Sequence, residues 1–312
     1  MEDSKNQSYK KQSQIFSDQS EKHSKLAETW FDESTADYWL HNRMYEAVDC
    51  IKNSDSSRWL TVGDGRWGLD AIRIKKRGFK DVLPSDLCET LLEESKERGL
   101  IDDYRVENVE QLSFADNSFD FVFCKESYHH FPRPYMALYE MLRVASKAVF
   151  LVEPNDEPMA PSVETTDWLR FKFKVLLSKL KMKVHLIHYR KPVVFAQKGY
   201  EESGNFIYSI SKHEIQKLMQ GLDYPQMVYK EMNTHYIEGC EFEPADLSKS
   251  SVFKQLVDTI RNEDERCAAG WDVPNMILLG LFKEKMNEET KMTFEKQGWT
   301  ILNLPRNPYL YK

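Results

Sequence analysis

The chain has 312 residues, 41% of them hydrophobic, and a formal net charge of −7, so it can bury a substantial core. The acidic balance argues against general nucleic-acid binding, and no apolar run approaches the roughly 20 residues of a membrane span. Residues 1–19 lack the apolar stretch of a secretory signal, and the five cysteines show no paired spacing. We therefore expect a cytoplasmic protein with reduced thiols, no zinc site and no stable membrane insertion.

Short apolar runs alternate with helical patterns along most of the chain. Strands are predicted over residues 58–62, 81–85, 104–107, 119–125, 147–152, 226–231 and 276–282, with a last extended piece over 299–304. Helices are predicted over residues 26–51, 67–77, 89–98, 133–145, 211–222, 250–261 and 288–296. This alternation predicts an α/β fold with a doubly wound, mostly parallel, seven-stranded Rossmann-like sheet.

The predicted sheet is flanked and interrupted by other segments. We divide the chain into a helical N-terminal extension (1–57), a core (58–155), a basic helical insertion after the fifth strand (156–205), the C-terminal half of the sheet (206–285) and a tail (286–312). Residues 1 to about 24 are rich in Ser, Lys and Gln and are predicted to be flexible. The aromatic residues of the N-terminal helix either fill the core or cover a ligand as a lid.

Closely spaced glycines follow the first predicted strand and precede a helical pattern. Gly63, Gly65 and Gly68 mark a turn where the backbone needs a positive φ or must approach a ligand closely. The helix N-terminus that follows offers free N–H groups to a nucleotide. This G-x-G-x-x-G spacing occurs in several nucleotide-binding families and predicts a nucleotide-binding corner, with a plain tight turn as the alternative.

Polar residues stand at the carboxyl ends of the predicted strands. They are Asp86, Asn108, Lys125, Glu126 and Glu153. Ligands of doubly wound sheets bind beyond this edge, so these side chains are expected to surround the ligand.

Residues 58–155 resemble the class I S-adenosylmethionine-dependent methyltransferases with small-molecule acceptors, in particular the methyltransferase type 11-like domain. The resemblance rests on ordered motifs: LTVGDG (60–65), LPSDL (83–87), NVEQLSF (108–114), NSFDFVFC (117–124), HHF (129–131) and EMLRV (140–144). It implies that the protein is a methyltransferase and that S-adenosyl-L-methionine is its cofactor.

The resemblance also implies roles for the cofactor-binding residues. Asp86 would accept hydrogen bonds from both ribose hydroxyls, and Leu87 would lie against the adenine face. Asn108 stands where the family usually has Asp, and its amide oxygen can accept from the adenine amino group. Val109 would offer its backbone N–H to the ring edge, and we place Lys125 with this set.

The glycine motif departs from the family at two positions. The acidic residue that commonly precedes the first glycine by two positions is Thr61 here, and the third glycine is replaced by Trp67. We expect Asp64, between Gly63 and Gly65, to replace the missing carboxylate near the methionine amino group.

Methyl transfer from a sulfonium mainly requires that acceptor, methyl group and sulfur be aligned. A hydroxyl acceptor benefits from a general base, whereas a neutral amine needs little help. The catalytic candidates are His129, Glu126 and Tyr128, and a histidine suits a base because it titrates near neutral pH. The neighbouring His130 is interpreted as a buried, hydrogen-bonded residue.

The resemblance implies that segments before the first strand and after the fifth select the acceptor. We predict transfer to an O or N atom of a polar small molecule, such as a sugar-like or phosphorylated one. The insertion has basic residues and no acid between 168 and 191, which favours an anionic acceptor or a lid with solvated lysines; these residues are Arg170, Lys172, Lys174, Lys179, Lys181, Lys183, Arg190 and Lys191.

Two other functions share part of this evidence. An NAD(P)-dependent Rossmann oxidoreductase would use the same glycine spacing and Asp86, but this function leaves the stretch from Phe119 to His130 unexplained. A cofactor-binding scaffold without catalysis is the remaining alternative.

Overall fold

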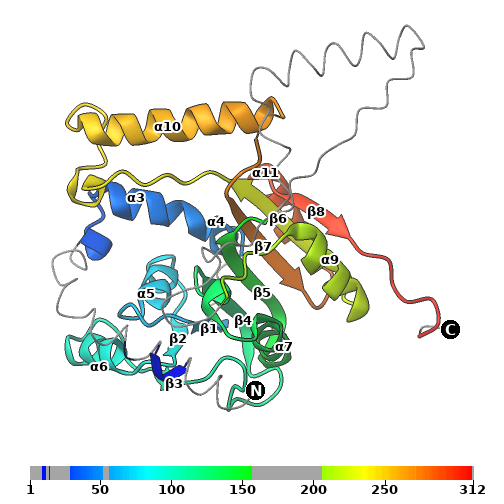
Figure 1. The fold of residues 1–312 in the computed structure, drawn as a ribbon. Helices are drawn as coiled ribbons and strands as arrows, with labels where there is room; N and C mark the ends of the chain where they lie inside the picture. The colour runs from blue at the N-terminus through cyan, green and yellow to red at the C-terminus, as the bar shows by residue number, and fades with distance from the viewer. Residues whose placement is uncertain are drawn as a thin grey trace, which may run out of the picture.

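The computed structural model describes residues 9–11, 14, 29–51, 56–156, 206–270 and 272–310. In these residues eight strands form one sheet, in the order β3-β2-β1-β4-β5-β7-β6-β8 (Figure 1). The strands are β1 Arg58–Val62, β2 Asp81–Asp86, β3 Arg105–Val106, β4 Phe119–Lys125, β5 Ala145–Pro154, β6 Gln226–Met232, β7 Met276–Phe282 and β8 Thr300–Asn303. The prediction of a mostly parallel α/β sheet is confirmed, but the sheet has one strand more than predicted because β8 pairs with β6 at the edge.

Strand direction changes in the second half of the sheet. Strands β1 to β5 pair in parallel, whereas β7 runs antiparallel to both β5 and β6, and β8 antiparallel to β6. Chain order reverses between β1 and β4, so a crevice opens beyond their carboxyl ends, where ligands of such sheets bind.

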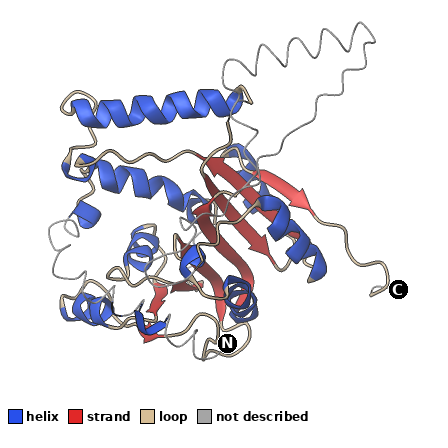
Figure 2. Ribbon diagram, viewed as in Figure 1, coloured by secondary structure: helices blue, strands red, loops and turns tan. Residues whose placement is uncertain are grey.

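Helices cover both faces of the sheet (Figure 2). The helices are α3 Ala36–Asn42, α4 Glu46–Asp49, α5 Leu69–Lys76, α6 Thr90–Glu97, α7 Pro134–Val144, α9 Lys212–Gly221, α10 Ser251–Ala268 and α11 Glu288–Lys296, with short 3₁₀ turns η1 Arg43–Tyr45, η2 Tyr128–His130 and η4 Cys240–Phe242. Apolar side chains of α7 and α9 pack on one face, and those of α4, α5 and α11 pack on the other. The central strands β4 and β7 are nearly all buried between these layers, which explains their largely apolar sequences.

The N-terminal helical region is divided, in contrast to the single helix predicted over 26–51. Thr35 caps α3 by accepting a hydrogen bond from the backbone N–H of Tyr38, and the turn η1 separates α3 from α4. This arrangement buries Tyr45 completely, stacked on Phe123 of β4. The N-terminal segment therefore contributes to the core.

Helix α3 also packs against a segment that is distant in the sequence. Leu40 of α3 shares an apolar cluster with Phe253 and Leu256 of α10, which lies between β6 and β7 in the chain. The two helices lie next to each other in Figure 1. No helix in the described ranges is long and apolar enough to cross a membrane. Apart from residue 156, the predicted basic insertion lies outside the described residues.

Candidate active site

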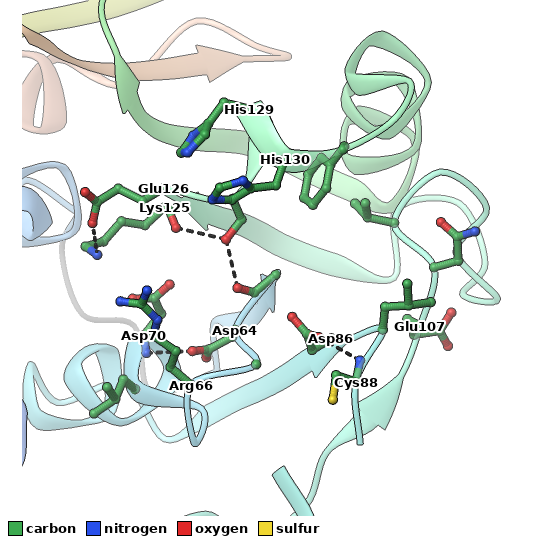
Figure 3. A pocket seen from close by; sticks show the side chains of 18 of the residues that line it. Asp64, Arg66, Asp70, Asp86, Cys88, Glu107, Lys125, Glu126, His129 and His130 are labelled. Carbon is green, nitrogen blue, oxygen red and sulfur yellow. Dashed lines mark hydrogen bonds and ion pairs between the residues drawn. The ribbon is translucent and has the colours of Figure 1, made fainter. Parts of the chain in front are cut away.

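A cavity of about 360 Å³ opens at the carboxyl ends of β1, β2 and β4. Its size falls within the range of small-molecule sites, roughly 300–1,000 Å³. All eight residues predicted to bind the cofactor line it, as do the candidate bases His129 and Glu126 (Figure 3). Tyr128 does not line this cavity; its side chain is buried in the hydrophobic core.

The glycine turn is attached to the end of β4. Ser127 Oγ donates a hydrogen bond of 2.8 Å to the carbonyl oxygen of Gly63. Gly63 has φ +69°, and a Cβ at this position would lie 2.4 Å from Ser127 Cβ. Only glycine therefore allows this approach.

The ribose wall is formed by Gly65 and Asp86. A Cβ at position 65 would lie 2.7 Å from the carboxyl carbon of Asp86, so the bare backbone keeps the carboxylate open to a ligand. Burial raises the pKa of Asp86 to about 6, although backbone N–H groups, including that of Cys88 at 2.7 Å, act to lower it. At neutral pH the carboxylate is ionised and suited to accept hydrogen bonds from two hydroxyls.

The loop after β3 forms the far end of the cavity. Asn108 Oδ1 accepts a hydrogen bond of 3.0 Å from the backbone N–H of Glu110, which leaves a second lone pair for a ligand amine. The buried carboxylate of Glu110 accepts from both the backbone N–H and Nε of Arg133, and thereby fixes the loop to the start of α7. Tyr9 also lines the cavity at this end, where burial and a hydrogen bond to Glu110 raise its pKa to about 12. A residue from the region predicted to be flexible thus reaches the site.

Asp64 has a structural task in addition to its place in the cavity wall. Its Oδ1 accepts from the N–H of Asp70, and its Oδ2 accepts from the N–H of Ala71, each at 3.0 Å. Thr61 Oγ1 donates to Oδ2 at 2.7 Å. Burial, followed by the negative charge of Asp70, raises the pKa of Asp64 well above its usual value. Asp64 therefore caps α5 and is not an open carboxylate.

Trp67 occupies the position of the family's third glycine. It has φ +57°, in the left-handed region that favours glycine, and its side chain is buried against Trp30 at a ring-centroid distance of 5.8 Å. The aromatic packing stabilises a turn whose backbone strain is of order 1–3 kcal/mol.

His129 and Glu153 form a pair at the cavity. His129 Nδ1 lies 2.6 Å from Glu153 Oε2, and the Glu153 side chain is fully buried. Glu153 Oε1 also accepts from the backbone N–H groups of Ser127 and Tyr128, at 3.0 and 2.9 Å. Glu153 Oε2 can accept a hydrogen bond from Nδ1–H, which directs the ring and leaves Nε2 as the acceptor nitrogen of the neutral imidazole. His130 also lines the cavity, with its ring centroid 3.9 Å from that of His129.

Charged residues from β4 and α3 line the wall next to this pair. Lys125 Nζ lies 2.6 Å from Glu126 Oε2, and His41 Nδ1 lies 3.5 Å from the same oxygen. Burial acts to raise the pKa of Glu126, but the charges of Lys125 and His41 and their hydrogen bonds lower it well below its usual value. Glu126 has φ +51°, a conformation that costs energy in a residue other than glycine and often occurs at functional sites.

Several lining residues were absent from the predicted cofactor and catalytic sets. They include Tyr9, Trp30, His41, Tyr45, Asp70, Arg73 and Ser127. The sequence contained a signal for Asp70 and Arg73, because both are charged residues on the buried face of α5. The remaining residues come from segments with no motif.

The comparison with protein families agrees with this geometry. Residues 60–152 match a family described as methyltransferase domain. No curated protein matches the sequence. Solved structures with a similar fold include the YcgJ protein of Bacillus subtilis, with 16% identity and a TM-score of 0.47 over 79% of this chain and 100% of that one.

Two further solved structures show a similar level of likeness. An S-adenosylmethionine-dependent methyltransferase of Thermotoga maritima has 17% identity and a TM-score of 0.44, over 86% of this chain and 97% of that one. The [4+2]-cyclase SpnF has 15% identity and a TM-score of 0.47, over 78% and 82%.

The domain match and the strand order define the class of protein. Residues 60–152 are a class I S-adenosylmethionine-dependent methyltransferase domain. Its cofactor is S-adenosylmethionine, and the site fits this group: an ionisable carboxylate lies beside bare backbone at Gly65, and Nε and Nη1 of the buried Arg73 lack hydrogen-bond partners.

Proposed function

We propose that the protein transfers a methyl group from S-adenosylmethionine to an O or N atom of a polar small molecule, with His129 as general base. The observation that carries the choice of base is the 2.6 Å contact between His129 and the fully buried Glu153, at the edge of the cavity. A buried carboxylate both orients the imidazole and stabilises its protonated form.

The lining residues suggest a division of tasks. Asp86 would hold the ribose hydroxyls, while Leu87, Asn108 and Val109 would surround the adenine. When bound, S-adenosylmethionine supplies a methyl group that is already activated by the positive sulfur. His129 would take the acceptor's proton at Nε2, and Glu153 would stabilise the charge that forms on the ring. Tyr128 is left out of this set because its side chain is in the core.

The acceptor is proposed to be polar because the wall beside His129 carries paired charges. His41, Lys125 and Glu126 offer both donors and acceptors of hydrogen bonds there. The basic insertion favours an acceptor with an anionic group, such as a phosphorylated small molecule. We further propose that the N-terminal extension and this insertion together select the acceptor.

Calorimetry with S-adenosylmethionine, S-adenosylhomocysteine and NAD tests the cofactor assignment directly. We expect binding of the first two and none of NAD. Transfer of a labelled methyl group to the small-molecule fraction of a cell extract then tests the activity and isolates the acceptor. Binding of NAD without S-adenosylmethionine would overturn the proposal, whereas cofactor binding without transfer to any acceptor fraction would favour a non-catalytic scaffold.

The role of His129 is tested by His129→Asn, with Glu153→Gln as its partner variant. We expect the first to reduce kcat by about 10²–10⁴-fold, the usual contribution of a general base. Glu153→Gln is expected to cause a smaller loss, because the ring remains but is less well oriented. The affinity for S-adenosylhomocysteine should change by less than about twofold in both variants, since each acts on the acceptor's proton. Full activity of His129→Asn would exclude this base.

A further inference from the structure

Arg73 is a buried cation with unused hydrogen-bonding capacity. The residue is 3% exposed and lines the cavity. Its Nη2 donates to the carbonyl oxygen of Trp30 at 3.3 Å, and its guanidinium lies over the rings of Tyr38 and Tyr45, at 4.5 and 5.5 Å from their centroids. The Nε and Nη1 groups are buried and have no hydrogen-bond partner. An unsatisfied buried donor lowers the stability of the folded protein, and a charged one lowers it more, so an anionic ligand is expected to complete the hydrogen bonds of Arg73.

Asp70 presents the opposite charge from the same helix. It is 6% exposed, lines the cavity and accepts a hydrogen bond from Tyr45 Oη through Oδ1. Asp70 and Arg73 are three residues apart, a spacing that places two side chains on one face of a helix. Helical side chains lean toward the N-terminus, so both lean toward the glycine turn.

The other acidic positions near this turn are already occupied or absent. Thr61 replaces the acidic residue that the family commonly carries there, and the Asp64 carboxylate is engaged by the N-terminus of α5 and by Thr61. Asp70 is therefore the acidic side chain of α5 that is available to bind a cation. Arg73 lies on the same face of the helix, and its guanidinium is available to bind an anion.

We propose that Asp70 and Arg73 together bind the amino-acid end of S-adenosylmethionine, with Arg73 holding the α-carboxylate and Asp70 the α-ammonium group. The planar guanidinium matches a carboxylate with two parallel N–H groups, which here are Nε–H and Nη1–H. A zwitterion satisfies both side chains at once. An anionic acceptor in the same place would leave Asp70 without a cation and would face its negative charge.

This inference rests on cofactor binding and does not depend on the proposed base or acceptor. It can be tested by calorimetry with three ligands that lose the amino-acid end stepwise. S-adenosylhomocysteine has both charges, its decarboxylated analogue keeps only the ammonium group, and 5′-methylthioadenosine has neither. Arg73→Met should lower the affinity for S-adenosylhomocysteine at least 10-fold and leave the affinity for the other two ligands within about twofold of the parent. Asp70→Asn should weaken S-adenosylhomocysteine and the decarboxylated analogue, and leave 5′-methylthioadenosine unchanged.

Lys75→Met is the matched control, because Lys75 lies on the same helix, pairs with Asp102 and does not line the cavity. It should bind all three ligands like the parent. Unchanged binding of 5′-methylthioadenosine also shows that a variant keeps its folded pocket. Equal weakening of all three ligands by Arg73→Met, or of none, would overturn the proposal.

If Arg73→Met does not fold, the proposal is tested with the parent protein and Arg73→Lys. The parent must then bind the decarboxylated analogue at least 10-fold more weakly than S-adenosylhomocysteine, and Arg73→Lys must recover part of that difference. Equal affinity of the parent for both ligands would exclude a carboxylate contact. A failed methyl-transfer assay with the expected three-ligand pattern would reject the proposed function and leave this inference intact.

Discussion

The two ends of the cavity are built in different ways. At the nucleotide end, the recognition groups follow directly after strands and are fixed by neighbours: Asp86 accepts from the N–H of Cys88 and Asn108 from that of Glu110, each two residues away. At the opposite end, contacts join distant segments. Tyr45 binds Asp70 across 25 positions, and Arg73 binds Trp30 across 43.

This difference explains why one end is visible as motifs and the other is not. Local hydrogen bonds require particular residue types at fixed short spacings, which a sequence displays. A cluster assembled from α3, α5 and the end of β4 requires only that the charges match after folding. The nucleotide end should therefore be sensitive to small local changes, and the opposite end to the loss of individual charges.

The largest effect is expected from Gly65→Val at the nucleotide end. A Cβ at this position lies 2.7 Å from Cγ of Asp86 and 2.8 Å from each of its oxygens, so a branched side chain must displace the carboxylate. Calorimetry should show that S-adenosylhomocysteine binds at least 100-fold more weakly, about 2.8 kcal/mol. The control is Gly221→Ala, where an added Cβ meets no atom within 4 Å. Normal affinity in Gly65→Val would mean that the ribose is held elsewhere.

Trp67→Gly tests whether packing or backbone conformation dominates in the glycine turn. Glycine would relieve the strain at φ +57° but remove a side chain buried against Trp30. Loss of a buried Trp usually costs about 3–5 kcal/mol and relief of the strain returns about 1–3 kcal/mol, so we expect a net destabilisation of about 1–3 kcal/mol in urea unfolding. A variant more stable than the parent would show that the strain outweighs the packing.

Asp86→Asn should raise the stability of the folded protein in a pH-dependent way and weaken the binding of the cofactor. Folding raises the pKa of Asp86 from 3.8 to about 6. Near pH 4 the carboxyl is largely protonated in the folded state, so the variant gains little there. Above pH 6 the carboxylate is ionised in both states and burial penalises the folded one. The gain should therefore grow to about 1–3 kcal/mol by pH 7.5, measured as Tm without ligand.

The accompanying loss of affinity is best measured with Asp86→Ala as well. Loss of hydrogen bonds to a charged acceptor should weaken S-adenosylhomocysteine by about 1.5–3 kcal/mol, with the protein still folded. A stability gain of equal size at pH 4.5 and 7.5 would contradict the pKa assignment, and an unchanged affinity would contradict the ribose contact.

The smallest effect on cofactor binding is expected from Glu126→Gln at the opposite end. The variant loses the ion pairs with Lys125 and His41, which involve a side chain that is 34% exposed, so stability should change by less than about 1 kcal/mol. Affinity for S-adenosylhomocysteine should stay within about twofold, while the acceptor KM rises several-fold. A loss of cofactor affinity as large as in Asp86→Ala would show that the two ends are not separate.

The sequence alone was sufficient for most of the sheet. The bounds of β1, β4 and β7 agree with those predicted, because continuous burial leaves an apolar run of definite length. The predicted helix over 26–51 was wrong in its continuity, because the break at η1 depends on Tyr45 entering the core beside Phe123. The last extended piece was not predicted as a strand of the sheet, because β8 is defined by its pairing with β6.

For the site, the sequence determined which residues follow the strands, since the carboxyl ends of parallel strands meet at one edge whatever packs around them. It did not determine what each carboxylate does there. Asp64 stands between two glycines, yet its oxygens cap α5, whereas Asp70 and Arg73 belong to no motif and lie in the cavity wall. Only the tertiary structure decided these tasks, because the environment of a charge depends on segments brought together by folding, and those segments are far apart along the chain.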